Sequence, residues 1–281
     1  MKRIAIIGSG ISGIGAAYAL KDTADITLFE AQDRLGGHAC THVFDYDGHE
    51  TAVDLGFIVY NGLNYPNLIG LFDALGVKTQ ESDMSFAVSD RDGWEWASTA
   101  RGIFAQKRNL FSIPFHRFWR TILKFNDLAR AELAAGRIED TTLGDWLDFH
   151  GFDQAFRCNY ILPMGAAIWS TPEVGMLDYP ARSFFQFFEN HRLMHKERPQ
   201  WRTVTGGSQS YVKAAAAELG DRVRTGTPAI RVFPFGDKIT VITADNRSHV
   251  FDDVILATHS DQALRLVEKG FEDQSSTVIR P

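Results

Sequence analysis

The amino-terminal stretch "IAIIGSGISGIGAAYAL" (residues 4–20) decides the fold class of this chain. The nearly all-apolar run at residues 3–7 is typical of a strand that is buried on both faces of a parallel sheet. Three glycines, Gly8, Gly10 and Gly13, follow in G-x-G-x-x-G spacing where a helix is predicted to begin. A second predicted strand at residues 25–30 completes the βαβ context that gives this glycine pattern its meaning.

The glycine turn predicts a binding site for the pyrophosphate of a dinucleotide. The first glycine permits the bend, the second lets the backbone approach the phosphates, and the third allows the helix to pack closely. The free N–H groups and positive dipole end of the helix favour an anion there. The predicted contacts in this turn are Gly8, Gly10, Ile11, Ser12 and Gly13. Glu30 is placed to accept hydrogen bonds from an adenosine ribose, and its charge disfavours a 2′-phosphate.

Composition excludes several other classes of protein. The chain has 281 residues and a formal net charge of -6, which argues against a nucleic-acid binder that must neutralise phosphates. Cys40 and Cys158 form no CxxC pair, so free thiols in a reducing compartment are expected. The first strand follows Met1 too closely for a signal peptide, and no apolar run approaches the roughly 20 residues of a membrane span. A cytoplasmic protein is therefore expected, at most peripheral at the inner face of the membrane.

The rest of the chain alternates between α/β and helical segments. Turn residues predict hairpins around Asp47–Gly48 and around residues 91–93. Apolar periodicity predicts helices at 65–76, 114–136, 142–150, 180–195 and 208–219. Strands are predicted at 228–235, 238–245 and 250–258. This pattern indicates two domains, a nucleotide-binding domain from residues 1–62 and 200–270 and a largely helical substrate domain from residues 63–199.

The stretch "EAQDRLGG" (residues 30–37) decides between nucleotide cofactors. Its Glu30, Arg34, Gly36 and Gly37 resemble the E-x-x-x-R-x-G-G motif of the flavin-containing amine oxidase superfamily, which includes phytoene desaturases and protoporphyrinogen oxidases. In these families the stretch, here with Ala31, wraps the cofactor, its arginine lies near the pyrophosphate and its glycines near the flavin. The resemblance implies FAD and an α/β, Rossmann-like domain of three-layer ββα type with a discontinuous α+β substrate domain.

Four further stretches resemble segments of the same families in the same order. They are "VDLGFIVYN" (53–61), "WRTVTGGSQSYV" (201–212), "RTGTPAIRV" (224–232) and "VILATHSDQAL" (254–264). The resemblance implies that the backbone of Ala229 and Ile230 meets the adenine. It also implies that Ala257 and Thr258 close the nucleotide site.

A finer resemblance concerns the substrate. The stretches "YPNLIGLF" (65–72), "FAQKRNL" (104–110) and "LPMGAAIWS" (162–170) resemble a bacterial group of predicted flavoproteins. Some members are encoded beside cyclopropane-fatty-acid-synthase-like methyltransferases, which implies a fatty acyl or other lipid substrate. In these families a final glycine-containing segment also holds the flavin. This sequence reaches Pro281 within what resembles the start of a strand (276–281), so the carboxyl-terminal part of the family fold is expected to be lacking.

The expected reaction is transfer of a hydride from a C–H bond of an apolar small molecule or lipid onto flavin. Three alternatives stay open, namely an amine oxidase, a non-redox flavoenzyme such as a mutase, and a non-catalytic nucleotide-binding protein. His38 is the best polar candidate near the flavin, where it would bind the ring, act as a base or satisfy a backbone group. Tyr60 and Asn61 are candidates for the substrate side, although a tyrosine in an apolar run also suits the core.

Three other patterns have both a functional and an ordinary structural explanation. His191 and His195 share a helix face but lack a third ligand, so a packed pair and no metal are expected. Ser208 and Ser210 lack the G-x-S-x-G spacing of a hydrolase nucleophile. Residues 101–130 interleave basic and aromatic residues, which suits either peripheral membrane contact or a helix with a solvated basic face. The electron acceptor and the oligomeric state are not predicted.

Overall fold

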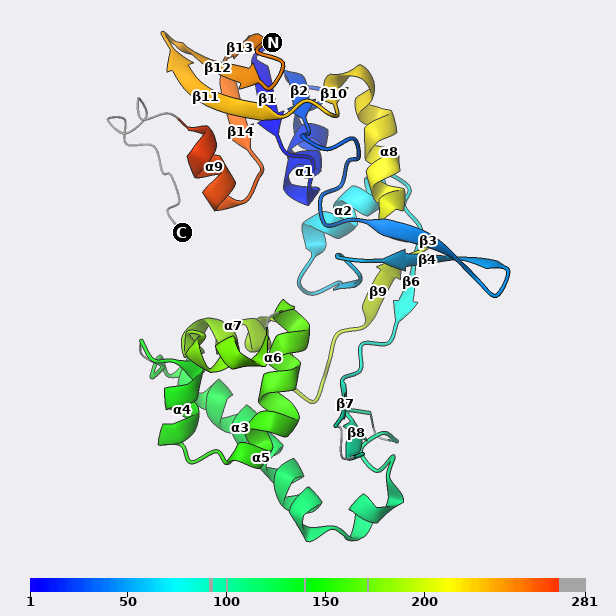
Figure 1. Cartoon of the computed structure of the whole chain (residues 1–281), viewed down its shortest axis with the longest axis vertical. Helices are drawn as coiled ribbons and strands as arrows, with labels where there is room; N and C mark the ends of the chain where they lie inside the picture. Colours follow the sequence, from blue (N-terminus) through cyan, green and yellow to red (C-terminus); the bar gives the residue numbers. More distant parts are fainter. Residues whose placement is uncertain (91–92, 100, 139, 171, 268–281) are drawn as a thin grey trace. The chain divides into compact units, whose positions relative to one another are not determined.

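The computed structural model describes residues 1–90, 93–99, 101–138, 140–170 and 172–267, and these form two compact units (Figure 1). Unit 1 comprises Met1–Ser82 and the described chain from Arg202 onward, and unit 2 is Asp83–Trp201. The first boundary lies at residue 82 and not at the expected residue 62, because β6 (Thr79–Ser82) joins a sheet of unit 1. The expected strand at 276–281 and the last three residues of the expected 200–270 segment lie outside the described residues.

A four-stranded parallel sheet forms the centre of unit 1. Its strands, in spatial order, are β10 (Val223–Arg224), β2 (Asp25–Phe29), β1 (Arg3–Ile7) and β14 (Asp253–Leu256). Ile6 of β1 pairs with Leu28 of β2 and with Ile255 of β14. Because the outer layers cover both faces of β1, its side chains from Ile4 to Ile7 are all buried.

Two further layers cover the parallel sheet. On one face, Ile4 and Ile6 pack in a cluster with Ala17 of α1 (Ile11–Leu20) and Leu219 of α8 (Gln209–Leu219). On the other face, Ala5 and Ile7 pack against an antiparallel sheet. That sheet consists of β11 (Ala229–Phe235), β12 (Lys238–Thr243) and β13 (Ser248–Phe251). The expected α/β, Rossmann-like architecture of three-layer ββα type is confirmed.

The expectation of one continuous strand over residues 250–258 is wrong. The chain leaves the antiparallel sheet after β13 and enters the parallel sheet at β14. Asp252 makes the junction, because its carboxylate accepts a 2.7 Å hydrogen bond from the Arg3 N–H and its own N–H donates to the Arg3 carbonyl. Only Asp252 and Asp253 separate the apolar residues of β13 from those of β14, so the sequence alone does not reveal the change of sheet.

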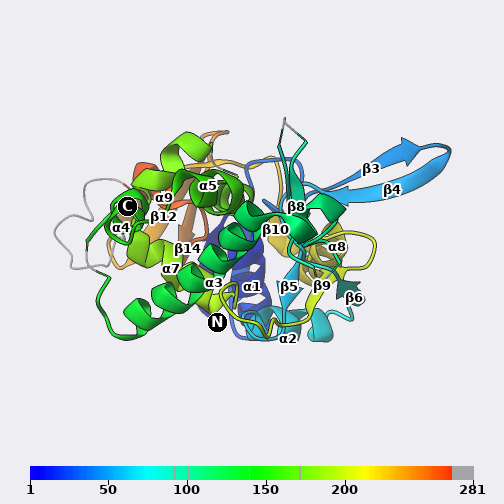
Figure 2. The ribbon, with the colours of Figure 1, turned by 90° about the horizontal axis from the view of Figure 1, so that it is seen from below.

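The remaining elements of unit 1 extend from this core. In the expected hairpin, β3 (Thr41–Tyr46) pairs with β4 (His49–Asp54), and positive φ angles at Asp47 and Gly48 suit a tight two-residue turn. Figures 1 and 2 both show this hairpin extending away from the rest of its unit. The other elements are β5 (Tyr60–Asn61), α2 (Pro66–Ala74), β9 (Trp201–Val204), η4 (Gly220–Arg222) and α9 (Ser260–Leu266).

Unit 2 is mainly helical and has an aromatic core. Its elements are β7 (Ala87–Ser89), β8 (Glu95–Ala97), η1 (Lys107–Phe111), α3 (Ile113–Ala134), α4 (Leu143–Phe149), α5 (Gln154–Phe156), η2 (Arg157–Ile161), α6 (Leu162–Trp169), η3 (Glu173–Asp178) and α7 (Ala181–Asn190). Phe125 of α3 is fully buried, and its ring contacts those of Trp146, Phe156 and Phe185. Such ring pairs stabilise a core beyond the area that they bury. In the described chain, no helix combines the length and apolar character needed to cross a bilayer.

Candidate functional site

A cavity of about 940 Å³ lies in unit 1, where the parallel strands end. Ile7 ends β1, Phe29 ends β2, and Ala257 directly follows β14, and all three residues line the cavity. Ligands of open α/β sheets bind in this place, outside the carboxyl ends of the strands. The cavity is at the upper end of the range of about 300–1,000 Å³ that is usual for small-molecule and cofactor sites.

The structure brings the predicted cofactor residues together around this cavity. Those that line it are Gly8, Gly10, Ile11, Ser12, Glu30, Ala31, Arg34, Gly36, Gly37, His38, Ala229, Ile230, Ala257 and Thr258. Gly13 does not line the cavity and lies behind the turn, where a Cβ atom would come within 1.8 Å of the Gly8 carbonyl oxygen. Direct contacts of these residues with a cofactor stay a prediction, whereas their convergence on one cavity is an observation.

The glycine turn leaves the start of α1 open to the cavity. Gly8 has a φ of 101°, a region that favours glycine, and a Cβ atom there would lie 2.5 Å from the Ala257 carbonyl oxygen. No side chain caps α1, and a Cβ atom on Gly10 would have no protein atom within 4 Å. The N–H groups of the first helical turn therefore face space in which a pyrophosphate fits.

Because the space beside Gly10 holds no protein atom, a substitution there tests ligand binding without disturbing the packing of the protein. We expect Gly10→Ala to fold normally, because the added methyl group meets no protein atom and the φ of -64° suits alanine. FAD affinity should fall about tenfold, because the methyl group occupies space at the helix start that the phosphates need. Fluorescence titration of the apoprotein with FAD would measure this, with the melting temperature as the control for folding. An unchanged FAD affinity would contradict the assignment of this space to the cofactor.

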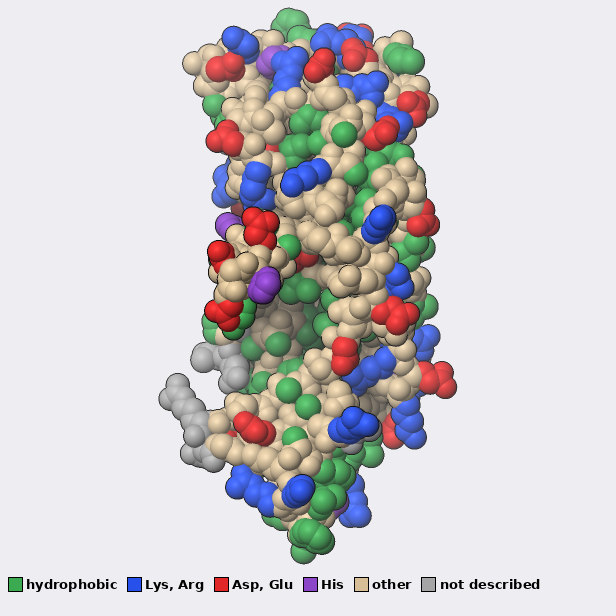
Figure 3. All heavy atoms as spheres, turned by 90° about the vertical axis from the view of Figure 1, so that its right-hand side faces the viewer, with side chains coloured by type: hydrophobic (Ala, Val, Ile, Leu, Met, Phe, Trp, Pro, Cys, Tyr) green, Lys and Arg blue, Asp and Glu red, His purple; other side chains and the backbone are tan. Residues whose placement is uncertain are grey.

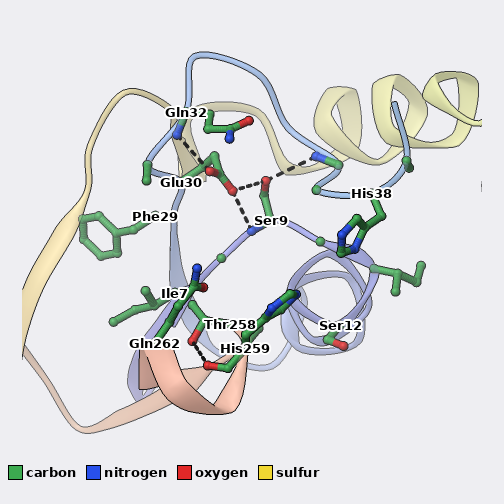
Figure 4. A pocket seen from close by; sticks show the side chains of 18 of the residues that line it. Ile7, Ser9, Ser12, Phe29, Glu30, Gln32, His38, Thr258, His259 and Gln262 are labelled. Carbon is green, nitrogen blue, oxygen red and sulfur yellow. Dashed lines mark hydrogen bonds between the residues drawn. The ribbon is translucent and has the colours of Figure 1, made fainter. Parts of the chain in front are cut away.

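Glu30 is held rigidly on the cavity wall (Figure 4). One carboxylate oxygen accepts hydrogen bonds from the Ser9 backbone N–H at 2.9 Å and from the Ser9 hydroxyl at 2.5 Å. The other oxygen accepts from the Gln32 N–H at 2.9 Å. A carboxylate has about four lone-pair sites, so these three bonds leave capacity for a ligand hydroxyl. Glu30 therefore keeps an acceptor site available for a ligand hydroxyl group in the cavity.

Ser9 lines the cavity and was not singled out by the sequence analysis. It is fully buried between the first two glycines of the motif, and its hydroxyl also accepts a 3.3 Å hydrogen bond from the Gly36 N–H. The Gly36 N–H donates in addition to the Ser9 carbonyl at 3.0 Å. Ser9 thus joins the glycine turn to the "EAQDRLGG" stretch. The sequence signal that could have identified Ser9 is its position as a small polar residue between two glycines of the motif.

A hydrogen bond within the "EAQDRLGG" stretch holds its second half in place. The Arg34 guanidinium donates a 3.0 Å hydrogen bond to the Gly37 carbonyl. A Cβ atom on Gly37 would lie 3.1 Å from the Cα of Gly10, so the two glycine-containing segments approach closely. Both parts of the sequence motif therefore form one continuous wall of the cavity.

His38 is exposed on the cavity wall beside a second histidine. Its ring stacks on that of His259, with 5.7 Å between the centroids and 27° between the planes (Figure 4). The sequence analysis missed His259, although it directly follows the Ala257–Thr258 strand end. Two imidazoles on one wall supply hydrogen-bond donors and acceptors for a ligand in the cavity.

The other two catalytic candidates do not reach the cavity. Tyr60 is 3% exposed and packs edge-on against Phe72, with 5.3 Å between the ring centroids. Asn61 is fully buried, and its side-chain oxygen accepts from the N–H groups of Leu63 and Asn64. The structure thus matches the core alternative for Tyr60 and gives Asn61 a role in shaping the following loop.

Nine further residues of the cavity wall were not predicted; two of them, Gln32 and Ala39, belong to or follow the "EAQDRLGG" stretch, and the other seven come from more distant segments. The seven distant residues are Phe57, Tyr65, Leu68, Tyr211, Gln262, Arg265 and Leu266. Burial, reinforced by the Asp54 carboxylate, raises the pKa of Tyr211 to about 12, and burial also raises the pKa of Tyr65. Both phenols therefore remain neutral at physiological pH and add aromatic surface without charge.

Packing accounts for the histidine pair and for the serine motif. His195 lies 2.9 Å from the Glu189 carboxylate, and His191 stacks on Trp201 and has a pKa lowered by burial. No group of three metal-ligating side chains occurs among the described residues. Ser208 is buried and donates a 2.8 Å hydrogen bond to Asp54, so its hydroxyl serves the structure. Cys40 and Cys158 are free thiols.

Comparisons with known proteins agree with this architecture. A family profile described as flavin containing amine oxidoreductase matches residues 11–278. Tryptophan 2-monooxygenase of Pseudomonas savastanoi is 25% identical, with 94% of this chain and 54% of that protein covered. A flavin-containing amine oxidase of Oncorhynchus mykiss is 26% identical, with 91% of this chain and 49% of that protein covered. The chain therefore spans about half the length of these curated relatives.

Solved structures show the same fold. A double mutant of putrescine oxidase, from a redesign of its cofactor binding, is similar with a TM-score of 0.72 at 24% sequence identity. The similarity covers 95% of this chain and 60% of that one. At this identity the likeness supports the architecture alone.

Proposed function

This chain belongs to the family of flavin-containing amine oxidoreductases, and on that premise we propose that it binds FAD in the unit 1 cavity and takes part in oxidising an amine. FAD, the cofactor expected from Arg34, Gly36 and Gly37, agrees with the flavin-containing family. The amine is the finer part of the proposal. It rests on the relatives, which are named as oxidases of amines or as a tryptophan monooxygenase.

The orientation of the Glu30 carboxylate is the observation that best supports the cofactor site. Its three internal hydrogen bonds aim it at the cavity, next to the uncapped start of α1. A carboxylate for ribose hydroxyls beside a helix amino terminus for phosphates matches the adenosine diphosphate half of FAD. The glycines supply the remaining requirement, which is close approach of the backbone.

Bound flavin would supply a two-electron acceptor for the hydride of a C–H bond beside an amine nitrogen. The residues of the chain would position the reactants and exclude water. Phe57, Tyr65 and Tyr211 provide an uncharged aromatic part of the wall. His38 and His259 provide the polar part and are candidates to hydrogen-bond the cofactor or substrate.

The proposal replaces the apolar acyl substrate that the sequence analysis favoured. That expectation rested on a gene-neighbourhood association, whereas the curated relatives point to amines. The amine alternative is therefore the better supported one. A non-redox flavoenzyme and a non-catalytic nucleotide binder are retained as outcomes of the experiment.

Anaerobic mixing of the purified protein with a panel of amines is expected to bleach its flavin absorbance. Alcohols and fatty acids with the same carbon skeletons serve as matched controls and should leave the absorbance unchanged. If a fatty acid bleached the flavin absorbance and no amine did, the substrate would be a lipid, as the sequence analysis expected. Bound FAD that no compound bleaches would favour a non-redox role, and protein that holds no FAD would refute the cofactor site.

A further inference from the structure

Unit 2 has an exposed surface on which apolar and basic side chains lie close together. We call it the basic tip and define it by eight of the exposed side chains of η1 and α3. They are Lys107, Arg108, Leu110, Phe111, Ile113, Arg117, Arg120 and Lys124. Figure 3 shows green hydrophobic side chains exposed among blue Lys and Arg side chains at its lower edge.

The apolar members of the basic tip are unusually exposed. Phe111 is 90% exposed and Ile113 is 83% exposed, and Leu110, the residue before Phe111 in η1, is also exposed. All three lie within four positions, at the turn where η1 ends and α3 begins. Single exposed apolar side chains are ordinary, whereas a contiguous group rimmed by polar residues marks an interaction surface.

The charge of this segment is opposite to that of the whole chain. Residues 96–126 contain six Lys and Arg residues and no Asp or Glu, in a chain whose net charge is -6. Within the described residues, Lys107, Arg117 and Arg120 form no ion pair with a carboxylate. Their charge is therefore available to an external anion.

The helix geometry keeps Arg117 and Arg120 away from the core, whereas the Lys124 ammonium lies 5.5 Å from the centroid of the Phe152 ring. Spacings of three and four residues place Phe115, Phe118 and Phe125 on the buried face of α3. Ile113 lies on the opposite face, and Arg117, Arg120 and Lys124 follow it at the same spacings. The basic stripe thus continues from the exposed apolar turn.

We propose that the basic tip docks on the surface of a bilayer that carries anionic phospholipids. Phe111 and Ile113 would enter the boundary between headgroups and acyl chains, while the cations along α3 would meet lipid phosphates. An acidic protein partner would satisfy the cations but leaves the protruding apolar turn unexplained. A bilayer surface accounts for both the cations and the apolar turn. The proposal does not depend on the proposed oxidation of amines.

Vesicle flotation tests this docking directly. The protein should float with vesicles of equal parts phosphatidylcholine and phosphatidylglycerol, and remain behind with pure phosphatidylcholine. Raising the salt concentration should release it, because salt screens exposed charges. Phe111→Ser should lower the vesicle partition coefficient about tenfold. A triple variant, Lys107→Ser, Arg117→Ser and Arg120→Ser, should lower it about a hundredfold, since each charge contributes about fivefold.

Matched controls exist in the same unit. Phe149 is 85% exposed beside Asp148, so Phe149→Ser removes an equally exposed ring outside the basic tip. Three exposed cations elsewhere in unit 2, Arg137, Arg182 and Lys196, provide a triple Ser variant with the same loss of charge. Both controls should float like the parent protein, and circular dichroism should show that all variants are folded.

Several outcomes would overturn the proposal. Failure of the parent protein to float with anionic vesicles would do so, as would flotation of the basic-tip variants at the level of the parent. Concentration-dependent dimerisation that Phe111→Ser abolishes, without vesicle binding, would assign the surface to a second copy of the chain. Because vesicle binding is measured without substrate, its result is separate from that of the amine experiment.

Discussion

Gly13→Ala is expected to lower the free energy of unfolding of unit 1 by about 3 kcal/mol and to abolish stable FAD binding. A Cβ atom at Gly13 would stand 1.8 Å from the Gly8 carbonyl oxygen and 2.9 Å from its carbonyl carbon. These are backbone atoms of the turn itself, so no side-chain rotation relieves the overlap. The start of α1 has to shift away from β1, and this shift moves the N–H groups that would hold the pyrophosphate.

Thermal unfolding and FAD retention after gel filtration measure the two effects. Gly15→Ala is the matched control, because Gly15 lies in the same helix and a Cβ atom there meets nothing within 4 Å. That variant should be unchanged or more stable by about 0.5–1 kcal/mol, since alanine suits a helix interior better than glycine. If Gly13→Ala melted like the parent and retained FAD, the close packing of turn and helix would not be essential.

Glu30→Gln is expected to lower FAD affinity by about 10- to 100-fold. Glu30 accepts three hydrogen bonds, two on one oxygen and one on the other. A glutamine amide has one oxygen, so its NH₂ group must face either the two Ser9 donors or the Gln32 N–H. The side chain then turns away, and a ribose loses both the oriented acceptor and its negative charge.

A fluorescence titration with FAD measures this loss. Ser9→Ala should show a smaller loss, because it removes the hydroxyl donor and leaves both backbone donors to Glu30 in place. Glu50→Gln on the exposed strand β4 makes the same chemical change outside the cavity and should bind FAD like the parent. Equal FAD affinities for Glu30→Gln and Glu50→Gln would remove Glu30 from the binding site.

Much of the secondary structure was predictable, in both units, because its signals are local. The alternation of strand, glycine turn, helix and strand by residue 30 depends on neighbours in the sequence, and the Asp47–Gly48 turn has its own signature. The helix predicted at 114–136 is observed as α3 at Ile113–Ala134. Its start is marked locally by Ser112, whose hydroxyl accepts from the Phe115 N–H, with a proline at position 114.

Boundaries and junctions were harder to predict, because they depend on residues far apart in the sequence. The switch from β13 to β14 rests on the pairing of Asp252 with Arg3. The position of β6 in unit 1 rests on its pairing with β9, more than a hundred residues away. Apolar periodicity identifies such segments as strands but carries no information about their partners.

By itself, the sequence determined the fold class, the flavin family and the glycine positions around which the cavity forms, because glycine patterns encode backbone conformation directly. Only the tertiary structure decided which side chains share the cavity. It placed His259 beside His38, brought Tyr211 to the wall and buried Tyr60 in the core. The physical reason is that a side chain's surroundings depend on how distant elements pack, whereas a turn depends on a few adjacent residues.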